Sequence, residues 1–254
     1  MIFTKKVNSL LLPEVKEILA SVDPKFNGRM PYETKIKDWL SPIIDLSDFY
    51  VYPVSGITTA IDWWMLNEKR GIYKYDGDYE WVDDTGNEVL YISCPSSIDG
   101  NHTSIPTDVP VVLDLAYVGT TSITKISMTK NIEKVFYSLS KPFGIGNVRT
   151  GWYFTRRPDI KLHNLTKEAG YYNYCASQYA EILLDNFDVS YIHNAFHDQQ
   201  ISICSEHGLT PSDSVWLSTS KDSKYQEFRR NSAIARLCIT KYMKEWEYDK
   251  DHNF

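Results

Sequence analysis

The chain contains few cysteines and lacks any pattern that would pair them. Only four of its 254 residues are cysteine, and none belongs to a CxxC pair; they are Cys94, Cys175, Cys204 and Cys238. This spacing argues against a disulfide framework and against a thioredoxin-type redox centre. A reducing cytoplasm is therefore the simplest location that the sequence predicts.

Long apolar stretches are also missing. No window approaches the length of uninterrupted apolar sequence that crosses a bilayer. The first twenty residues, MIFTKKVNSLLLPEVKEILA, contain lysines and leucines, but Pro13 and Glu14 interrupt the apolar run and no small-residue cleavage site follows. This pattern favours an amphipathic helix over residues 11–22 rather than a secretory signal.

The sequence has no cluster of one charge sign. The 27 lysines and arginines and the 33 aspartates and glutamates give a net charge of -6, without a long basic run. This balance excludes the electrostatic footprint of a nucleic-acid or anionic-membrane binder and leaves small molecules or proteins as partners. A hydrophobic content of 43% supports a sizeable core, in one large α/β domain with a smaller appendage.

Apolar runs that are rich in Val, Ile, Tyr and Phe alternate with helical patterns through the first two thirds of the chain. A strand, a Ser-Gly turn and a helix are expected over residues 50–54, 55–56 and 58–69. Further buried strands are expected at residues 89–94, 109–115, 134–138 and 151–155. This order predicts a three-layer α/β fold around a mostly parallel central sheet.

The last third of the chain has a different pattern. Helices are expected at residues 173–186 and 191–207, with Pro211 ending the second. Strands at 215–218 and 233–240 would form a reduced C-terminal α+β portion. The predicted organisation is thus an N-terminal helical arm (1–49), a large domain (50–208) and a reduced small domain (209–254).

The segment SLSKPFGIGNVRTGW carries the strongest chemical signal. Ser138, Ser140 and Lys141 end a predicted strand, and Arg149 follows eight residues after the lysine. A phosphate dianion prefers a guanidinium fork and hydroxyl donors, and a desolvated lysine can lose its proton at neutral pH. The segment resembles the lysine motif of fold-type I pyridoxal-phosphate-dependent aminotransferases, the aspartate aminotransferase superfamily. The resemblance implies that Lys141 forms a Schiff base with the cofactor, while the serines and the arginine hold its phosphate.

A second match lies in VPVVLDLAYVG, where Asp114 and Tyr117 stand at the end of an apolar strand. A buried carboxylate is tolerated when it meets a cation, and the protonated pyridine nitrogen of pyridoxal phosphate is one. The resemblance places Asp114 on that nitrogen and Tyr117 on the phenolic oxygen. Both residues are therefore predicted to be catalytic together with Lys141.

A third match is VYPVSGITTAID, which runs from a strand through a turn into a helix. Free backbone N–H groups and the positive end of a helix dipole bind anions, and glycine lets the backbone approach the ligand closely. The cofactor phosphate is accordingly expected at Ser55, Gly56, Ile57 and Thr58.

Looser matches extend the predicted site. Tyr79 or Trp81 falls where the family stacks an aromatic ring on the cofactor, and Ser97 stands where it normally has an asparagine. Arg236 resembles the late arginine that grips the substrate carboxylate. The resemblance covers residues 50–157 well and the rest in outline, and family members are usually considerably longer.

The resemblance implies an aminotransferase that uses pyridoxal 5'-phosphate, takes an amino acid or amine and a keto acid, and forms a homodimer. No metal is expected. Another pyridoxal-phosphate reaction of the same fold, by a lyase, decarboxylase or racemase, is the alternative, because the cofactor sets the chemistry and the pocket only directs it. A non-catalytic binding protein with this fold is a further alternative, against which the intact Lys141, Asp114 and Arg149 argue.

Three other motifs suggest alternative functions. Ser138 and Lys141 spell the SxxK of penicillin-binding proteins, but no KTG or SDN follows. Gly144 and Gly146 form a lone GxG, which is too little for a dinucleotide site. An HxxxH pattern followed by CxxH would place metal ligands on one helix, although exposed histidines are more common at such spacing; its residues are His193, His197, Cys204 and His207.

Overall fold

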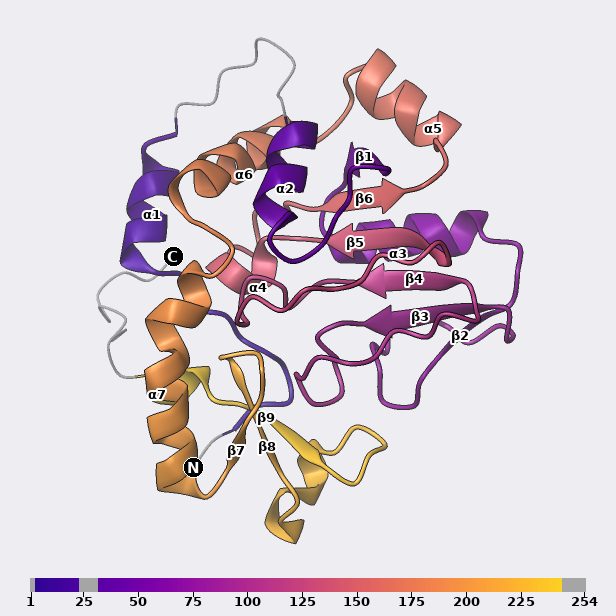
Figure 1. Cartoon of the computed structure of the whole chain (residues 1–254). Helices are drawn as coiled ribbons and strands as arrows, with labels where there is room; N and C mark the ends of the chain where they lie inside the picture. Colours follow the sequence, from indigo (N-terminus) through magenta and orange to yellow (C-terminus); the bar gives the residue numbers. More distant parts are fainter. Residues whose placement is uncertain (1–2, 23–31, 244–254) are drawn as a thin grey trace.

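The computed structural model describes residues 3–22 and 32–243 and is built around a six-stranded sheet (Figure 1). The strand order is β1-β6-β5-β4-β3-β2. Strands β2, β3, β4 and β5 pair in parallel, whereas β6 is antiparallel to both of its neighbours. The predicted mostly parallel sheet is confirmed; its strands are β1 (Tyr50–Pro53), β2 (Ile72–Lys74), β3 (Val89–Ser93), β4 (Val111–Asp114), β5 (Ile132–Tyr137) and β6 (Trp152–Thr155).

Side chains of the sheet alternate between two apolar cores, as the period of a strand requires. Tyr91, Val112 and Phe136 point to the core that contains helix α3 (Ile57–Asn67). Their chain neighbours point to the opposite core, which also contains apolar residues of α1 (Pro13–Ala20), α2 (Tyr32–Leu40), α6 (Tyr174–Asn186) and α7 (Tyr191–His207). Helices therefore cover both faces of the sheet, which gives the expected three layers.

A second, antiparallel sheet follows α7 and has the order β7-β8-β9. The main chain ties this portion to the large sheet, because Ser214 N–H donates to Gly100 O at 3.0 Å and Val215 N–H to Thr120 O at 2.9 Å. Figure 1 shows it in orange and yellow on the side toward which β3, β4 and β5 point. Its elements are β7 (Thr210–Pro211), β8 (Leu217–Ser220), η2 (Ser223–Phe228), β9 (Ala235–Cys238) and η3 (Thr240–Tyr242).

Helix α7 spans Tyr191–His207, the range that the sequence predicts. The residue that ends it is Gly208, which adopts a left-handed conformation with φ of 63°. Pro211 lies in β7 instead, so the prediction that this proline ends the helix was wrong. The sequence analysis also missed α2, β2 and three short helical segments, α4 (Ser140–Phe143), α5 (Ile160–His163) and η1 (Asn164–Glu168).

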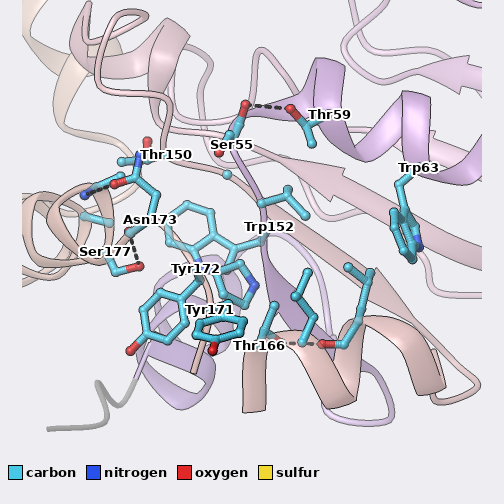
Figure 2. A pocket seen from close by; sticks show the side chains of 17 residues that line it. Ser55, Thr59, Trp63, Thr150, Trp152, Thr166, Tyr171, Tyr172, Asn173 and Ser177 are labelled. Carbon is cyan, nitrogen blue, oxygen red and sulfur yellow. Dashed lines mark hydrogen bonds between the residues drawn. The ribbon is translucent and has the colours of Figure 1, made fainter. Parts of the chain in front are cut away.

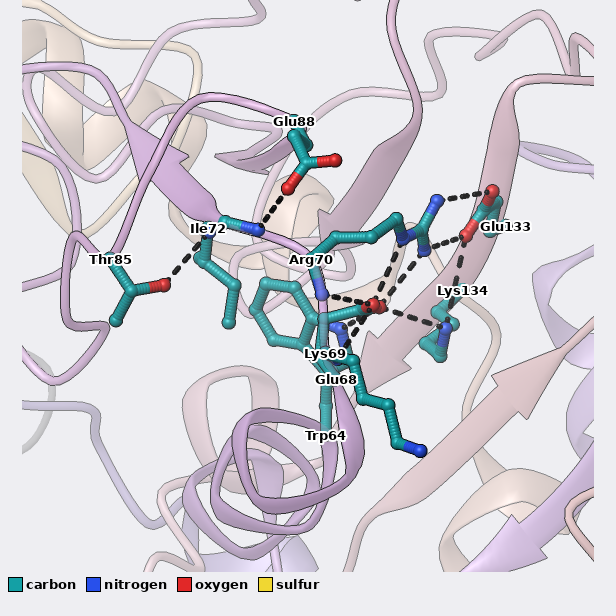
Figure 3. A network of polar contacts seen from close by, with 10 residues as sticks. Trp64, Glu68, Lys69, Arg70, Ile72, Thr85, Glu88, Glu133 and Lys134 are labelled. Carbon is teal, nitrogen blue, oxygen red and sulfur yellow. Dashed lines mark hydrogen bonds and ion pairs between the residues drawn. The ribbon is translucent and has the colours of Figure 1, made fainter.

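A network of ion pairs lies at the edge of the sheet where β5 begins (Figure 3). Glu68, just after α3, accepts from Arg70 Nε at 2.9 Å, and Arg70 Nη2 lies 2.6 Å from Glu133. Lys134 lies 3.8 Å from Glu68. Each of these two cations thus faces at least one carboxylate.

No helix in the described part of the chain has both the length and the apolar character that crossing a membrane requires.

Candidate active site

A large cavity lies where the parallel strands end. Its volume is about 1130 Å³, and Ser93, Asp114 and Ser138 bring the carboxyl ends of β3, β4 and β5 to it. This is the edge at which open α/β sheets bind their ligands. Many of the residues predicted for the site line this cavity: Ile57, Thr58, Tyr79, Ser97, Asp114, Tyr117, Ser138, Ser140, Lys141, Arg149 and Arg236.

Lys141 lies in the short helix α4, directly after β5. Its Nζ donates to Val7 O at 2.8 Å. Burial lowers the pKa of Lys141, and within residues 3–22 and 32–243 no carboxylate forms an ion pair with it. The side chain is thus an amine that gives up its proton more readily than an exposed lysine does.

Asp114 ends strand β4 and is 3% exposed. Its Oδ1 accepts from Ala116 N–H at 2.7 Å, and its Oδ2 accepts from the hydroxyl of Tyr91. Burial raises the pKa of Asp114 to about 7. A cation placed beside this carboxylate would reverse that shift and be held strongly, because opposite charges attract more in a water-poor site.

The turn between β1 and α3 fits the guanidinium of Arg149. Gly56 has φ of 83° and stands at the N-terminus of α3, which no side chain caps. A Cβ at residue 56 would lie 2.6 Å from Arg149 Nη2. Any other residue at this position would therefore clash with the guanidinium where it now lies. The same Nη2 donates to Ser55 O at 3.0 Å. Backbone N–H groups and a guanidinium therefore converge at one end of the cavity, as an anion site requires.

Two serine hydroxyls complete this part of the cavity wall. Ser138 is 4% exposed. The Oγ of Ser140 is buried and has no hydrogen-bond partner among the described residues. Because an unpaired buried hydroxyl costs free energy, this group is available to donate to a ligand in the cavity.

Arg236 reaches the cavity from strand β9 and is 4% exposed. Its Nη1 donates to Ser97 O and, at 3.4 Å, to the hydroxyl of Tyr117, while its Nη2 donates to Lys5 O at 2.9 Å. Burial lowers the pKa of Arg236 and raises the pKa of Tyr117. The arginine thus presents a buried charge to a cavity, with neutral oxygens as its partners.

Comparisons with known proteins find likeness only in three dimensions. No protein-family model matches the sequence, and no curated protein does. Tyrosine aminotransferase from Leishmania infantum superposes with a TM-score of 0.66 at 13% identity, covering 94% of this chain and 89% of that chain. Histidinol-phosphate aminotransferase from Sinorhizobium meliloti, in complex with pyridoxal-5'-phosphate, gives 0.62 at 13% identity, with 91% and 84% covered. The chain has the fold of these aminotransferases.

The same fold also carries other reactions. L-Threonine-O-3-phosphate decarboxylase from Porphyromonas gingivalis superposes with a TM-score of 0.61 at 12% identity, covering 91% of this chain and 93% of that chain. The fold class predicted from the sequence is confirmed by these likenesses. At such identities they describe the aminotransferase fold alone, so the chemistry has to be argued from the side chains.

Of the two aromatic residues predicted as alternatives, the structure brings one to the cavity. Tyr79 lines it and interacts with the side chain of Thr58. Trp81 is 50% exposed, does not line the cavity, and donates to Asp62 Oδ1 at 2.7 Å. Tyr79 is therefore the better placed of the two to touch a ligand.

Sequence reasoning missed Asp78, a buried carboxylate in the cavity wall. Its Oδ1 accepts from Ser93 Oγ and from Ser97 Oγ, both at 2.6 Å. It thereby fixes Ser97, whose carbonyl faces Arg236. The only sequence signal is the Asp-Gly-Asp of residues 76–78, which is also typical of an ordinary turn.

A smaller cavity of about 190 Å³ adjoins the turn at Ser55 (Figure 2). Trp152, Tyr171 and Tyr172 surround it, and the buried Oγ1 of Thr150 has no partner among the described residues. Its described lining includes no Lys, Arg, Asp, Glu or His. This cavity therefore offers a ligand none of those five kinds of charged or basic side chain.

The histidine and cysteine pattern on α7 does not converge. The rings of His193 and His197 stack with centroids 4.7 Å apart, whereas Cys204 is buried and burial raises its pKa to about 11. No group of three His, Cys, Asp or Glu residues in the described ranges is arranged to hold a metal ion.

Proposed function

We propose that the chain is a pyridoxal-phosphate-dependent aminotransferase that moves an amino group between an amino acid and a keto acid. One observation carries the proposal: Asp114, at the end of β4, and Lys141 and Arg149, from the segment after β5, line one cavity of the aminotransferase fold. Each is chemically matched to a different part of the cofactor.

The residues of the cavity fit the cofactor. The guanidinium of Arg149, which Gly56 admits beside the start of α3, and the unpaired hydroxyl of Ser140 suit a phosphate. Asp114 is a buried carboxylate without an ion-pair partner among the described residues, and a protonated pyridine nitrogen would supply one. When bound, pyridoxal phosphate supplies an electron sink for carbanion chemistry at the substrate Cα.

Lys141 would hold the cofactor and manage the proton. It lies four residues after the end of β5, and its lowered pKa lets its Nζ act as a nucleophile and later as a base. Once the substrate amine displaces it, Nζ would take the Cα proton and return it to a neighbouring carbon. Asp114 would keep the ring nitrogen protonated throughout.

The phosphate end would be anchored by residues from two parts of the chain. Arg149, Ser138 and Ser140 would donate from the segment after β5, and the N–H groups of Ile57 and Thr58 from the start of α3. Gly56 allows this close approach, and Ser55 holds Arg149 through its carbonyl.

The remaining predicted residues would orient the cofactor and the substrate. Tyr79 would lie against the ring, Tyr117 would donate to the phenolic oxygen, and Arg236 would bind the substrate carboxylate. Ser97 stands in the family's asparagine position, but its hydroxyl donates to Asp78. We therefore assign Ser97 the role of holding Arg236 through its carbonyl.

We propose further that the protein is a homodimer. We also propose that it acts in a reducing compartment such as the cytoplasm, in line with the four free thiols. We also propose that residues 1–49 form an arm, 50–208 the cofactor-binding domain and 209–254 a reduced small domain, of which 244–254 lie outside the described residues. Decarboxylation is the second candidate reaction, because a decarboxylase shares the fold.

Reduction with borohydride tests the central assignment. Purified protein incubated with excess pyridoxal phosphate should absorb visible light, lose that absorption on reduction, and carry the added mass on Lys141 in a peptide map. Lys141→Arg should abolish the adduct. Lys134→Arg is a matched control, because Lys134 is a half-buried lysine whose neighbours are Glu68 and Glu133. An adduct on another lysine, or no bound cofactor, would contradict the proposal.

Isotope transfer separates the two candidate reactions. An aminotransferase should move ¹⁵N from labelled amino acids to an added keto acid, whereas a decarboxylase should release CO₂ and leave the nitrogen on the product amine. A screen of donors and acceptors scored by mass spectrometry measures both products in one assay.

A further inference from the structure

Two guanidinium groups meet at one carbonyl oxygen beside the proposed substrate site. Nη1 of Arg236 and, at 3.3 Å, Nη1 of Arg230 both donate to Ser97 O. Both arginines line the cavity. Because the two nitrogens share one acceptor, the two positive charges are close neighbours.

Nothing in the described residues neutralises this pair at short range. Neither guanidinium forms an ion pair within residues 3–22 and 32–243, and Glu80 acts on Arg236 only from beyond ion-pair distance. Burial and the neighbouring charge of Arg230 both lower the pKa of Arg236. Two like charges that share a water-poor wall repel each other, and an anionic ligand would remove that cost.

The backbone around Arg230 holds it in place. Gly77 has φ of 82°, and a Cβ there would lie 1.8 Å from the carbonyl oxygen of Arg230, so the two segments pack main chain against main chain. Asn231 follows with φ of 49°, a conformation that costs free energy in a residue with a side chain. Asp78, next to Gly77, also holds Ser97. One loop thus positions the arginine and the carbonyl that it shares with Arg236.

We propose that Arg230 binds a second anionic group of the substrate, so that the preferred amino acid carries a carboxylate or phosphate on a short side chain. This inference rests on the proposed function, in which Arg236 takes the α-carboxylate. A side-chain anion one to three carbons away would then reach Arg230, because both guanidiniums flank the same carbonyl. Carboxylate and phosphate oxygens both accept from a guanidinium fork.

Binding of unreactive anions tests this without relying on turnover. Isothermal titration calorimetry would compare succinate and 3-phosphopropionate, which have two anionic groups, with butyrate, which has one. In protein loaded with pyridoxal phosphate, we expect at least one of the two dianions to bind 10-fold tighter than butyrate or better, since a charge-assisted hydrogen bond is worth about that much. Which dianion binds tighter distinguishes a dicarboxylic from a phosphorylated substrate.

Arg230→Gln should remove the preference while leaving the Kd of butyrate within about 2-fold, and Arg230→Lys should keep part of it. Arg157→Gln is the matched control, because Arg157 is an exposed arginine that does not line the cavity. Retained preference in Arg230→Gln, equal loss in Arg157→Gln, or no preference in the unmodified protein would overturn the inference. Unchanged butyrate binding shows that a variant is folded.

Failure of this inference is distinguishable from failure of the proposed function. A protein that forms the Lys141 adduct but does not discriminate dianions contradicts the inference alone. A protein that forms no adduct contradicts the proposed function. The same titrations on that cofactor-free protein would still decide whether Arg230 contributes to an anion site, because both guanidiniums belong to this chain.

Discussion

The cations at the two ends of the central parallel strands have different partners. At the edge where β5 begins, Arg70 and Lys134 face the carboxylates of Glu68 and Glu133. At the edge where β5 ends, the partners of the cations are neutral backbone oxygens: Lys141 donates to Val7 O, Arg149 to Ser55 O and Arg236 to Lys5 O. The cations at the first edge form ion pairs, whereas these three cations at the second form none with the described residues.

The carboxylates at the two edges differ in the same way. Although burial acts to raise the pKa of Glu68, hydrogen bonds from Arg70 lower it to about 2. Asp114 lacks such a cation, and burial raises its pKa to about 7. A group that is paired stabilises the folded chain in its charged form, whereas an unpaired one is destabilising in that form until a ligand arrives. The opposite pKa shifts of Glu68 and Asp114 therefore distinguish a structural ion-pair network from a candidate binding site.

The largest effect that we predict is the change in the free energy of unfolding with pH. Between pH about 4 and about 7, folded cofactor-free protein retains the proton on Asp114 that the unfolded chain has lost, so its free energy of unfolding should fall as pH rises. A difference of about 3 pKa units corresponds to roughly 4 kcal/mol at most. Asp114→Asn should lack this slope in urea denaturation from pH 5 to 8, and saturating pyridoxal phosphate should reduce it in the unmodified protein. Parallel curves for both proteins would mean that Asp114 does not carry the slope.

Arginine substitutions at the two edges should have opposite consequences. Arg149→Ala removes a phosphate donor, so the Kd of pyridoxal phosphate should rise roughly 10- to 100-fold, the cost of one charge-assisted hydrogen bond. Arg70→Ala should leave that Kd unchanged and lower the free energy of unfolding by about 1–3 kcal/mol, because it leaves Glu68 without its main cation. Fluorescence titration and urea denaturation on both variants measure the comparison. The same profile for the two variants would show that the edges do not differ as proposed.

Strand-end residues of the site could be predicted because their position follows from local pattern. Apolar runs marked β3, β4 and β5, and parallel strands bring their carboxyl ends to one edge, so Asp114 and Lys141 had to lie near each other. Alternation also fixed which core each strand residue enters. The roles proposed for these residues remain predictions until a cofactor is shown to bind.

Features that depend on contacts between distant segments could not be predicted. Asp78 matters because residues 93 and 97 fold onto it, and Arg230 because Gly77 admits its backbone. Helix α2 is a different case, because its buried apolar residues Ile36, Trp39 and Leu40 have the i, i+3, i+4 spacing typical of a helix, so the sequence does carry a signal for it. The end of α7 at residue 207 was predicted, but the residue that ends the helix is Gly208 and not Pro211.

The smallest effect that we predict is on the Kd of pyridoxal phosphate, and it should distinguish Tyr79 from Trp81, the two aromatic residues that the sequence left as alternatives. Tyr79 lines the cavity beside Thr58, whereas Trp81 points its indole N–H at Asp62 outside it. Tyr79→Leu should therefore weaken pyridoxal phosphate binding by roughly 5- to 10-fold, the value of one ring contact. Trp81→Leu should leave the Kd within about 2-fold. Both Kd values come from the same fluorescence titration, with the visible spectrum as a check that the cofactor environment is intact. If Trp81→Leu weakened binding more than Tyr79→Leu, the loop at residues 76–81 would have to close differently when the cofactor binds.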